Sequence, residues 1–161
     1  MAITNHERVG KALELLRVGL TPFVEREFKA KYGDGWAFEV KDVLSDTRLG
    51  SGKAESLNDV AALLVVMDRK WSDVFRQILG KTERSLVNEI LAVRNNWAHQ
   101  APFSSDDAYR ALDSAARLLV AISALQADDV EKMKTELLRV RFDEQARSEK
   151  RKSSSTAIES G

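Results

Sequence analysis

The stretch of this chain that is most informative about its fold and its chemistry is Ile90-Leu91-Ala92-Val93-Arg94-Asn95-Asn96-Trp97-Ala98-His99, residues 90–99. An apolar run with helical spacing leads into it, and the turn Gln100-Ala101-Pro102 follows at once. We therefore expect residues 94–99 to form the last turn and a half of a helix. Strong hydrogen-bond donors and one imidazole would then lie where that helix meets its exit loop.

The two sides of this expected helix have different characters. At about 3.6 residues per turn, Asn95 and His99 share one face, and Arg94 lies on the neighbouring ridge, at the margin of the apolar face. A separate apolar stripe should face the core, which makes its tryptophan a packing residue. The members of this stripe are Leu86, Ile90, Val93 and Trp97.

These residue types suit metal-free cleavage of RNA. The imidazole of His99 can take a proton from a ribose 2′-hydroxyl or give one to a leaving 5′-oxygen. The guanidinium of Arg94 can bind a phosphate in bidentate fashion, and Asn95 can orient either group. Such a reaction leaves a 2′,3′-cyclic phosphate. One histidine cannot easily be both acid and base, so two copies of the motif in a dimer would make a better site.

A purely structural explanation of the same residues stays open. A histidine in the last turn of a helix is favoured by the helix dipole alone. Arginine and asparagine near a helix C-terminus can simply bind its free carbonyl groups.

Composition limits the class of protein. The chain has 161 residues, enough for one domain with a real core, and its 25 basic and 25 acidic residues cancel. It has no cysteine, which excludes disulfides, zinc fingers and thiol catalysis. The sequence contains no glycine-rich phosphate loop and no HExxH motif, so we expect neither a cofactor nor a metal ion. The absence of a signal-like or membrane-spanning run predicts a cytoplasmic protein.

Helical spacing of apolar residues predicts an all-α fold, an up-and-down bundle of about five to six helices. Thr4 and Glu7 form a capping-box pattern that opens the first helix. Thr21-Pro22 should kink that helix or restart it, and Gly33-Asp34-Gly35 should end it. Residues 36–55 are expected to be an irregular loop with, at most, a short extended piece.

Further helix boundaries follow from capping signals. Ser56-Leu57-Asn58-Asp59 should open a second helix, with a break at Asp68-Arg69-Lys70 and a stop at Gly80. Thr82 is expected to cap the helix that carries the motif, and Ser104 with Asp107 the next, alanine-rich helix.

A last helix should begin at Asp128 or Asp129, with an apolar stripe formed by Val130, Met133, Leu137 and Val140. We expect residues 1–145 to form the helical domain. Residues 146–161 are expected to be a polar tail or linker that leads to another domain of a longer protein.

With these features in view, the chain resembles the HEPN superfamily (higher eukaryotes and prokaryotes nucleotide-binding), whose signature is an arginine followed, after four to six residues, by a histidine. Arg94 and His99 have the four-residue spacing, and Asn95 occupies the position where the family favours a polar residue. More of the chain is similar to the Swt-one-like subgroup, over roughly residues 9–125. The segments that carry this similarity are residues 12–27, Tyr32-Gly33-Asp34-Gly35-Trp36, the set Asp68, Trp71 and Phe75, and residues 104–119.

The resemblance implies a homodimer in which two Arg94/His99 motifs face each other, with contacts through the motif helix and the alanine-rich helix. It implies RNA as substrate and a fused or associated ATPase or helicase module, in phage defence or RNA surveillance. The candidate catalytic residues are Arg94, Asn95 and His99. Asp68, as an ion-pair partner of Arg94, and Asn96 are the candidates for supporting them.

Three hypotheses about function remain open. The first is a metal-independent endoribonuclease, and the second is a catalytically silent module for dimerisation or RNA binding within a larger protein. The third is a toxin that is neutralised when a nucleotide is transferred to a residue of the motif.

Overall fold

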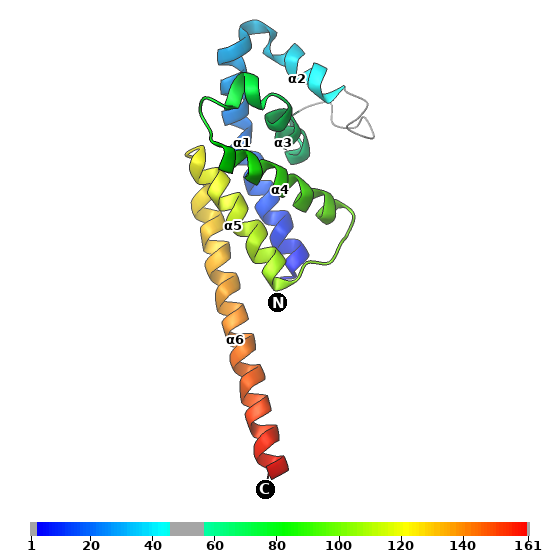
Figure 1. Cartoon of the computed structure of the whole chain (residues 1–161), viewed down its shortest axis with the longest axis vertical. Coiled ribbons are helices and arrows are strands. Elements are labelled where there is room, and N and C mark those ends of the chain that lie inside the picture. Colours follow the sequence, from blue (N-terminus) through cyan, green and yellow to red (C-terminus); the bar gives the residue numbers. More distant parts are fainter. Residues whose placement is uncertain (1–2, 46–56, 161) are drawn as a thin grey trace.

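The computed structural model of the chain describes residues 3–45 and 57–160, with side chains up to residue 154. It confirms the all-α prediction, because these residues form six α-helices and no strand (Figure 1). The α-helices are α1 (Asn5–Tyr32), α2 (Trp36–Leu44), α3 (Val60–Arg69), α4 (Lys81–Ala98), α5 (Ser105–Ala121) and α6 (Gln126–Ser160). Two short turns join them, the 3-10 turn η1 (Gly33–Gly35) and the π-helical turn η3 (Trp71–Phe75).

Helix α1 runs the whole height of the bundle and forms its central element (Figure 1). It begins as predicted, since the Thr4 side chain accepts a hydrogen bond of 3.0 Å from the backbone N–H of Glu7. The predicted restart at Pro22 is wrong, because α1 continues unbroken through that residue. Pro22 deprives the carbonyl of Val18 of its usual donor, but Val18 lies on the solvent side of the helix, 41% exposed.

The predicted irregular loop at residues 36–55 is wrong in its first half. Residues 36–44 form α2, which buries Val40, Val43 and Leu44 at helical spacing. Phe38 is 71% exposed and so obscures the periodicity of this nine-residue helix. The rest of the predicted loop, residues 46–55, lies outside the described residues, as does Ser56.

Three predicted helix starts are displaced. Helix α3 begins at Val60 with Asp59 as its N-cap, not near Ser56, and α4 begins at Lys81 after Gly80, without a side-chain cap from Thr82. Helix α6 begins at Gln126, before the predicted start at Asp128 or Asp129. The predicted break after Arg69 is confirmed, and so is the capping box at the start of α5, where Ser104 and Asp107 bond each other's backbone N–H.

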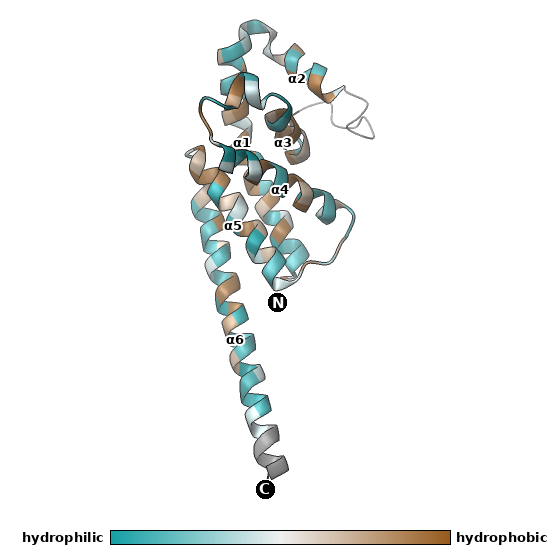
Figure 2. Ribbon diagram, in the orientation of Figure 1, coloured by the Kyte–Doolittle hydropathy of each residue, from teal (hydrophilic) through white to brown (hydrophobic). Residues whose placement is uncertain are grey.

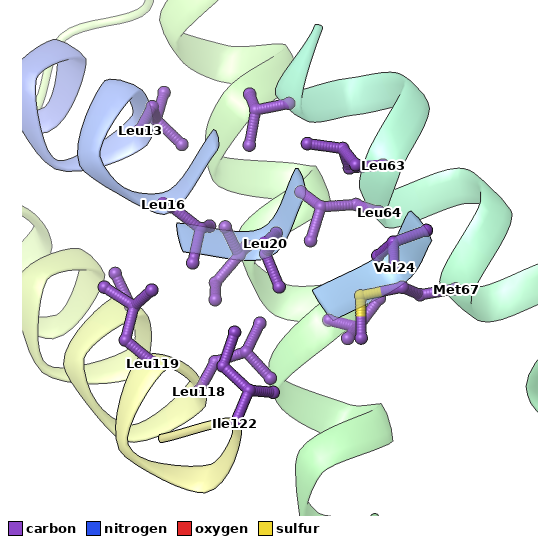
Figure 3. Packing of buried hydrophobic residues seen from close by; sticks show 14 of the residues in the cluster. Leu13, Leu16, Leu20, Val24, Leu63, Leu64, Met67, Leu118, Leu119 and Ile122 are labelled. Carbon is purple, nitrogen blue, oxygen red and sulfur yellow. The ribbon is translucent and has the colours of Figure 1, made fainter. Parts of the chain in front are cut away.

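The core lies where α1, α3 and α5 meet (Figure 3). Leu16, Leu20 and Val24 of α1 are fully buried between Leu63, Leu64 and Met67 of α3 and Leu118 and Leu119 of α5. The helices approach closely, since a Cβ atom built on Gly19 of α1 would lie 2.5 Å from Leu119 Cδ2. Four alanines of α5 serve the same close packing and are buried inside the chain; they are Ala108, Ala111, Ala115 and Ala116.

Helix α6 packs against α1 and α5 as far as Arg141, which pairs with Asp106 at the start of α5, and then leaves the bundle (Figure 1). Val130 and Leu137 are buried as predicted, whereas all described side chains from Phe142 onward are exposed. Hydrophilic residues dominate this outer part of the helix (Figure 2). The segment predicted as a polar tail therefore continues α6 as far as Ser160. Among the described residues, no helix combines the length and the apolar character needed to cross a membrane.

Candidate functional site

The motif lies at the C-terminal end of α4, which has a buried side and an exposed side. Val87 and Ile90 are buried, and Leu86, Val93 and Trp97 pack against the core as predicted. The opposite side is here called the outer face of α4. Its residues are all exposed, and at 100° per residue each of them points within about 60° of their common mean direction. These residues are Lys81, Arg84, Ser85, Asn88, Ala92, Asn95, Asn96 and His99.

Arg94 forms an ion pair with Asp59, at 3.2 Å between Nη2 and Oδ2. The predicted partner, Asp68, is wrong, because Asp68 lies 3.2 Å from Arg84 instead. Asp59 also accepts a hydrogen bond of 2.8 Å at Oδ1 from the backbone N–H of Ala61 and so caps α3. One carboxylate therefore fixes the start of α3 and holds the arginine of the motif.

Arg94 lines a hollow of about 380 Å³ between α1, the start of α3 and α4. Two guanidinium groups, those of Arg17 and Arg94, and two carboxylates, those of Glu14 and Asp59, line it together. Arg17 and Glu14 pair at 2.6 Å, and this hydrogen bond holds the pKa of the Glu14 carboxyl below its usual range. The side chain of Arg94 is 28% exposed, so an incoming phosphate can reach it and compete with Asp59.

His99 and Asn95 share the outer face of α4, as predicted, and Asn96 lies beside them. The backbone N–H of His99 donates to the Asn95 carbonyl at 3.1 Å, and Gln100, with φ of 60°, ends the helix. Arg94 and His99 are five positions apart, which separates their directions by about 140° around the helix axis. Within one chain the arginine therefore turns toward Asp59, and the imidazole faces solvent.

His6 is a neighbour of the motif that the sequence did not indicate. Its ring stacks on Trp97 at 5.1 Å between centroids and 11° between planes. Its Nε2 lies 3.1 Å from the Trp97 carbonyl oxygen, and the Trp97 indole Nε1 donates to the His6 carbonyl at 3.1 Å. His6 and Trp97 are 91 residues apart, so no local pattern could have paired them.

No cluster of three or more His, Asp or Glu side chains suited to a metal ion occurs in the described part of the chain. The polar groups at this end of α4 are the imidazole of His99, the amides of Asn95 and Asn96 and, on another side of the helix, the guanidinium of Arg94.

Comparison with known proteins gives one match. The family described as Swt1-like HEPN matches residues 11–123, which is well over half of the chain and runs from within α1 past the end of α5, with the whole motif. No curated protein and no solved structure matches the chain.

Proposed function

Because the chain belongs to the Swt1-like HEPN family, a branch of a superfamily with nuclease and RNA-related roles, we propose that it is a metal-independent endoribonuclease domain. The observation that carries this proposal is the arrangement at the end of α4. Asn95 and His99 lie side by side on an exposed face without a carboxylate, and Arg94 stands behind them with 28% of its side chain accessible.

The proposed reaction is an internal transesterification of RNA. The ribose 2′-oxygen attacks the adjacent phosphorus, and the bond from phosphorus to the 5′-oxygen breaks, which leaves a 2′,3′-cyclic phosphate and a 5′-hydroxyl. The neutral imidazole of His99 takes the 2′-hydroxyl proton, and a protonated imidazole returns a proton to the 5′-oxygen. Arg94 exchanges Asp59 for the phosphate and stabilises its developing charge, while Asn95 orients the scissile group.

The two proton-transfer roles favour a homodimer. One His99 serves as base, and His99 of the partner subunit serves as acid. The C-terminal end of the outer face of α4, around Asn96 and His99, is the surface we assign to this contact, because it is exposed and carries the motif histidine. Four alanines of α5 do not form part of it, since they are buried within the chain; they are Ala108, Ala111, Ala115 and Ala116.

A second candidate function is a catalytically silent module for dimerisation or RNA binding. The ion pair between Arg94 and Asp59 favours it, because a phosphate must displace a carboxylate that also caps α3. In this case the outer face of α4 would serve binding alone.

The surrounding biology is also a proposal. The family resemblance supports a cytoplasmic role in phage defence or RNA surveillance, together with an ATPase or helicase module. Association of such a module with the full-length protein, tested by co-purification followed by mass spectrometry, would support this part.

The test of the nuclease is cleavage of total RNA in excess chelator by the parent, His99→Ala, Arg94→Ala and Asn95→Ala. Arg139→Ala, on the exposed side of α6, is the matched control for the loss of a cation. The proposal expects cleavage by the parent and the control, with cyclic-phosphate ends, and a loss of at least about 100-fold in His99→Ala.

The outcome that contradicts the nuclease is equally clear. If a folded, dimeric parent leaves RNA intact, or if His99→Ala cleaves at the parental rate, the binding module becomes the better description. Circular dichroism of each variant keeps loss of activity separate from loss of fold.

A further inference from the structure

A second hollow, of about 410 Å³, lies at the other end of α4, far from His99. It forms where the π-helical turn η3 meets the start of α4. The residues around it that matter here are Trp71, Arg76, Lys81, Arg84, Ser85 and Asn88. Here it is called the basic pocket.

The basic pocket carries an excess of positive charge. Arg84 pairs with Asp68 at 3.2 Å and lies over the ring of Trp71, 6.0 Å from its centroid. Arg76 and Lys81 are exposed, and neither has an ion-pair partner among the residues that the structure describes. Three cations thus face one carboxylate in a chain whose formal net charge is zero. Such a local concentration of positive charge attracts anions.

The turn η3 gives the pocket a fixed shape. The backbone N–H of Arg76 donates to the Trp71 carbonyl at 2.8 Å, a bond across five residues that widens the helix locally. Trp71 is 4% exposed and packs on Phe75, so this wall of the pocket is anchored in the core. π-helical turns of this kind occur frequently at functional sites.

The basic pocket is continuous with the motif along the outer face of α4. Lys81 and His99 point in the same direction, and eighteen residues at about 1.5 Å each place them roughly 27 Å apart. Between them the face presents a hydroxyl, amides and an alanine, and none of its residues is acidic. Of the carboxylates beside this face, that of Asp68 is bound by Arg84 and that of Glu89 by Arg110.

We propose that the basic pocket is a binding subsite for the phosphodiester backbone of single-stranded RNA, several nucleotides away from the bond cleaved at His99. This inference rests on the proposed ribonuclease function. The cations of the pocket contact phosphates, and the amides between pocket and motif offer donors and acceptors to base edges. The outer face of α4 has no acidic residue of its own over this length, which suits a polyanion that lies along the helix.

The test uses the full chain and a single-stranded RNA 12-mer with 2′-O-methyl groups, which cannot be cleaved because the attacking hydroxyl is blocked. Fluorescence anisotropy gives its dissociation constant at several salt concentrations. The variant is Arg76→Ala/Lys81→Ala, and Arg76→Gln/Lys81→Gln is a milder second version. The matched control, Arg147→Ala/Lys150→Ala, removes two exposed cations from α6.

Each phosphate contact that is lost should lower the slope of log K against log salt by about 0.7. We expect the slope to fall by up to about 1.4 in Arg76→Ala/Lys81→Ala, with weaker binding of every RNA sequence alike. The control should keep the parental slope. A parental slope in both pocket variants, or no RNA binding by the folded parent, would overturn the subsite.

The two proposals fail in different ways. If the salt dependence of RNA binding falls in the pocket variants but the parent does not cleave RNA, the subsite is supported and the nuclease proposal fails. If the parent cleaves RNA through His99 but the salt dependence is the same in the pocket variants, the nuclease is supported and the subsite proposal fails. Tight, pocket-dependent binding of an acidic peptide, together with RNA binding that ignores the pocket, would also overturn the subsite.

Discussion

His6 and Trp97 hold each other by two reciprocal hydrogen bonds and a stacked ring contact. Each residue supplies a ring nitrogen to the other's backbone carbonyl at 3.1 Å, and the ring planes differ by 11°. The first turn of α1 is thereby fastened to the last turn of α4, two positions before His99. The orientation of the motif depends on this contact as well as on α4 itself.

The first prediction concerns Gly10, which lies against Trp97. A Cβ atom at Gly10 would come within 2.9 Å of the Trp97 indole Nε1, the atom that donates to His6. Helix propensity favours alanine over glycine by about 1 kcal/mol, but displacing a pinned indole costs about 1–3 kcal/mol. We expect Gly10→Ala to lower the melting temperature measured by circular dichroism.

Gly35→Ala is the control for this experiment, because a Cβ atom there meets nothing within 4 Å. We expect its melting temperature to match or exceed that of the parent. An increase in Gly10→Ala of the same size as in Gly35→Ala would show that Trp97 moves aside freely and does not tie α1 to α4.

The second prediction separates the two roles of Asp59. Asparagine also caps helices, so Asp59→Asn should retain the stability of α3, whereas Asp59→Ala should lose about 1 kcal/mol in urea unfolding. Asp59→Asn removes the carboxylate that competes with phosphate for Arg94. We therefore expect the variant to bind uncleavable RNA more tightly than the parent.

Asp143→Asn, an exposed change of the same charge on α6, is the control for long-range electrostatics. Weaker RNA binding by Asp59→Asn would mean that Asp59 positions Arg94 for the phosphate and does not compete with it.

The third prediction tests the C-terminal end of the outer face of α4 as the surface for dimerisation. Asn96 is exposed there, so a glutamate in its place should leave the fold of one chain stable to within about 0.5 kcal/mol. In a two-fold dimer the new charges meet near the axis and repel each other. Sedimentation equilibrium should therefore find Asn96→Glu monomeric and the control Ala146→Glu dimeric. A dimeric Asn96→Glu would move the interface away from this end of α4.

The fourth prediction is a dependence of stability on pH at the contact between α5 and α6. The hydrogen bond from Lys134 to Asp113, at 2.8 Å, holds the pKa of the Asp113 carboxyl below its ordinary value, and Arg117 adds to this. A pKa that is lower in the folded than in the unfolded protein stabilises the fold at pH values above the unfolded pKa, which is near 4 for an aspartate. This contribution disappears as the pH falls through the pKa of the folded protein.

Asp113→Asn should therefore unfold at lower urea concentration than the parent at pH 7, by about 1 kcal/mol. The difference between the two proteins should shrink toward zero below about pH 4. An unchanged difference from pH 7 to pH 3 would mean that the charge of Asp113 does not stabilise the contact.

The long helices could be predicted from the sequence because each carries an apolar stripe, whereas capping signals located the starts of α1 and α5 but not those of α4 and α6. The spacing identified Ile90 of α4 and Leu137 of α6 as buried, but the buried Val87 and Ala127 lay outside the predicted stripes. Helix α2 was missed because nine residues with an exposed phenylalanine do not reveal a period. The break at Pro22 was overestimated because one missing donor on a solvent-facing side of a long helix is tolerated.

The contacts around the motif were harder to predict because they join distant parts of the chain. Asp59 and Asp68 flank the same helix, and only the fold decides that the first meets Arg94 and the second meets Arg84. His6 contacts Trp97 because α1 and α4 lie side by side at that end of the bundle (Figure 1). Local patterns carry no information about such pairs.

The four residues between Arg94 and His99 set the angle between the directions of these two side chains around the helix axis. Each residue added to or removed from this interval turns the imidazole by about 100° relative to the guanidinium. An inserted alanine would carry His99 off the outer face of α4 while leaving both side chains intact. The length of this interval therefore sets the direction from which each of the two side chains can reach a bound phosphate.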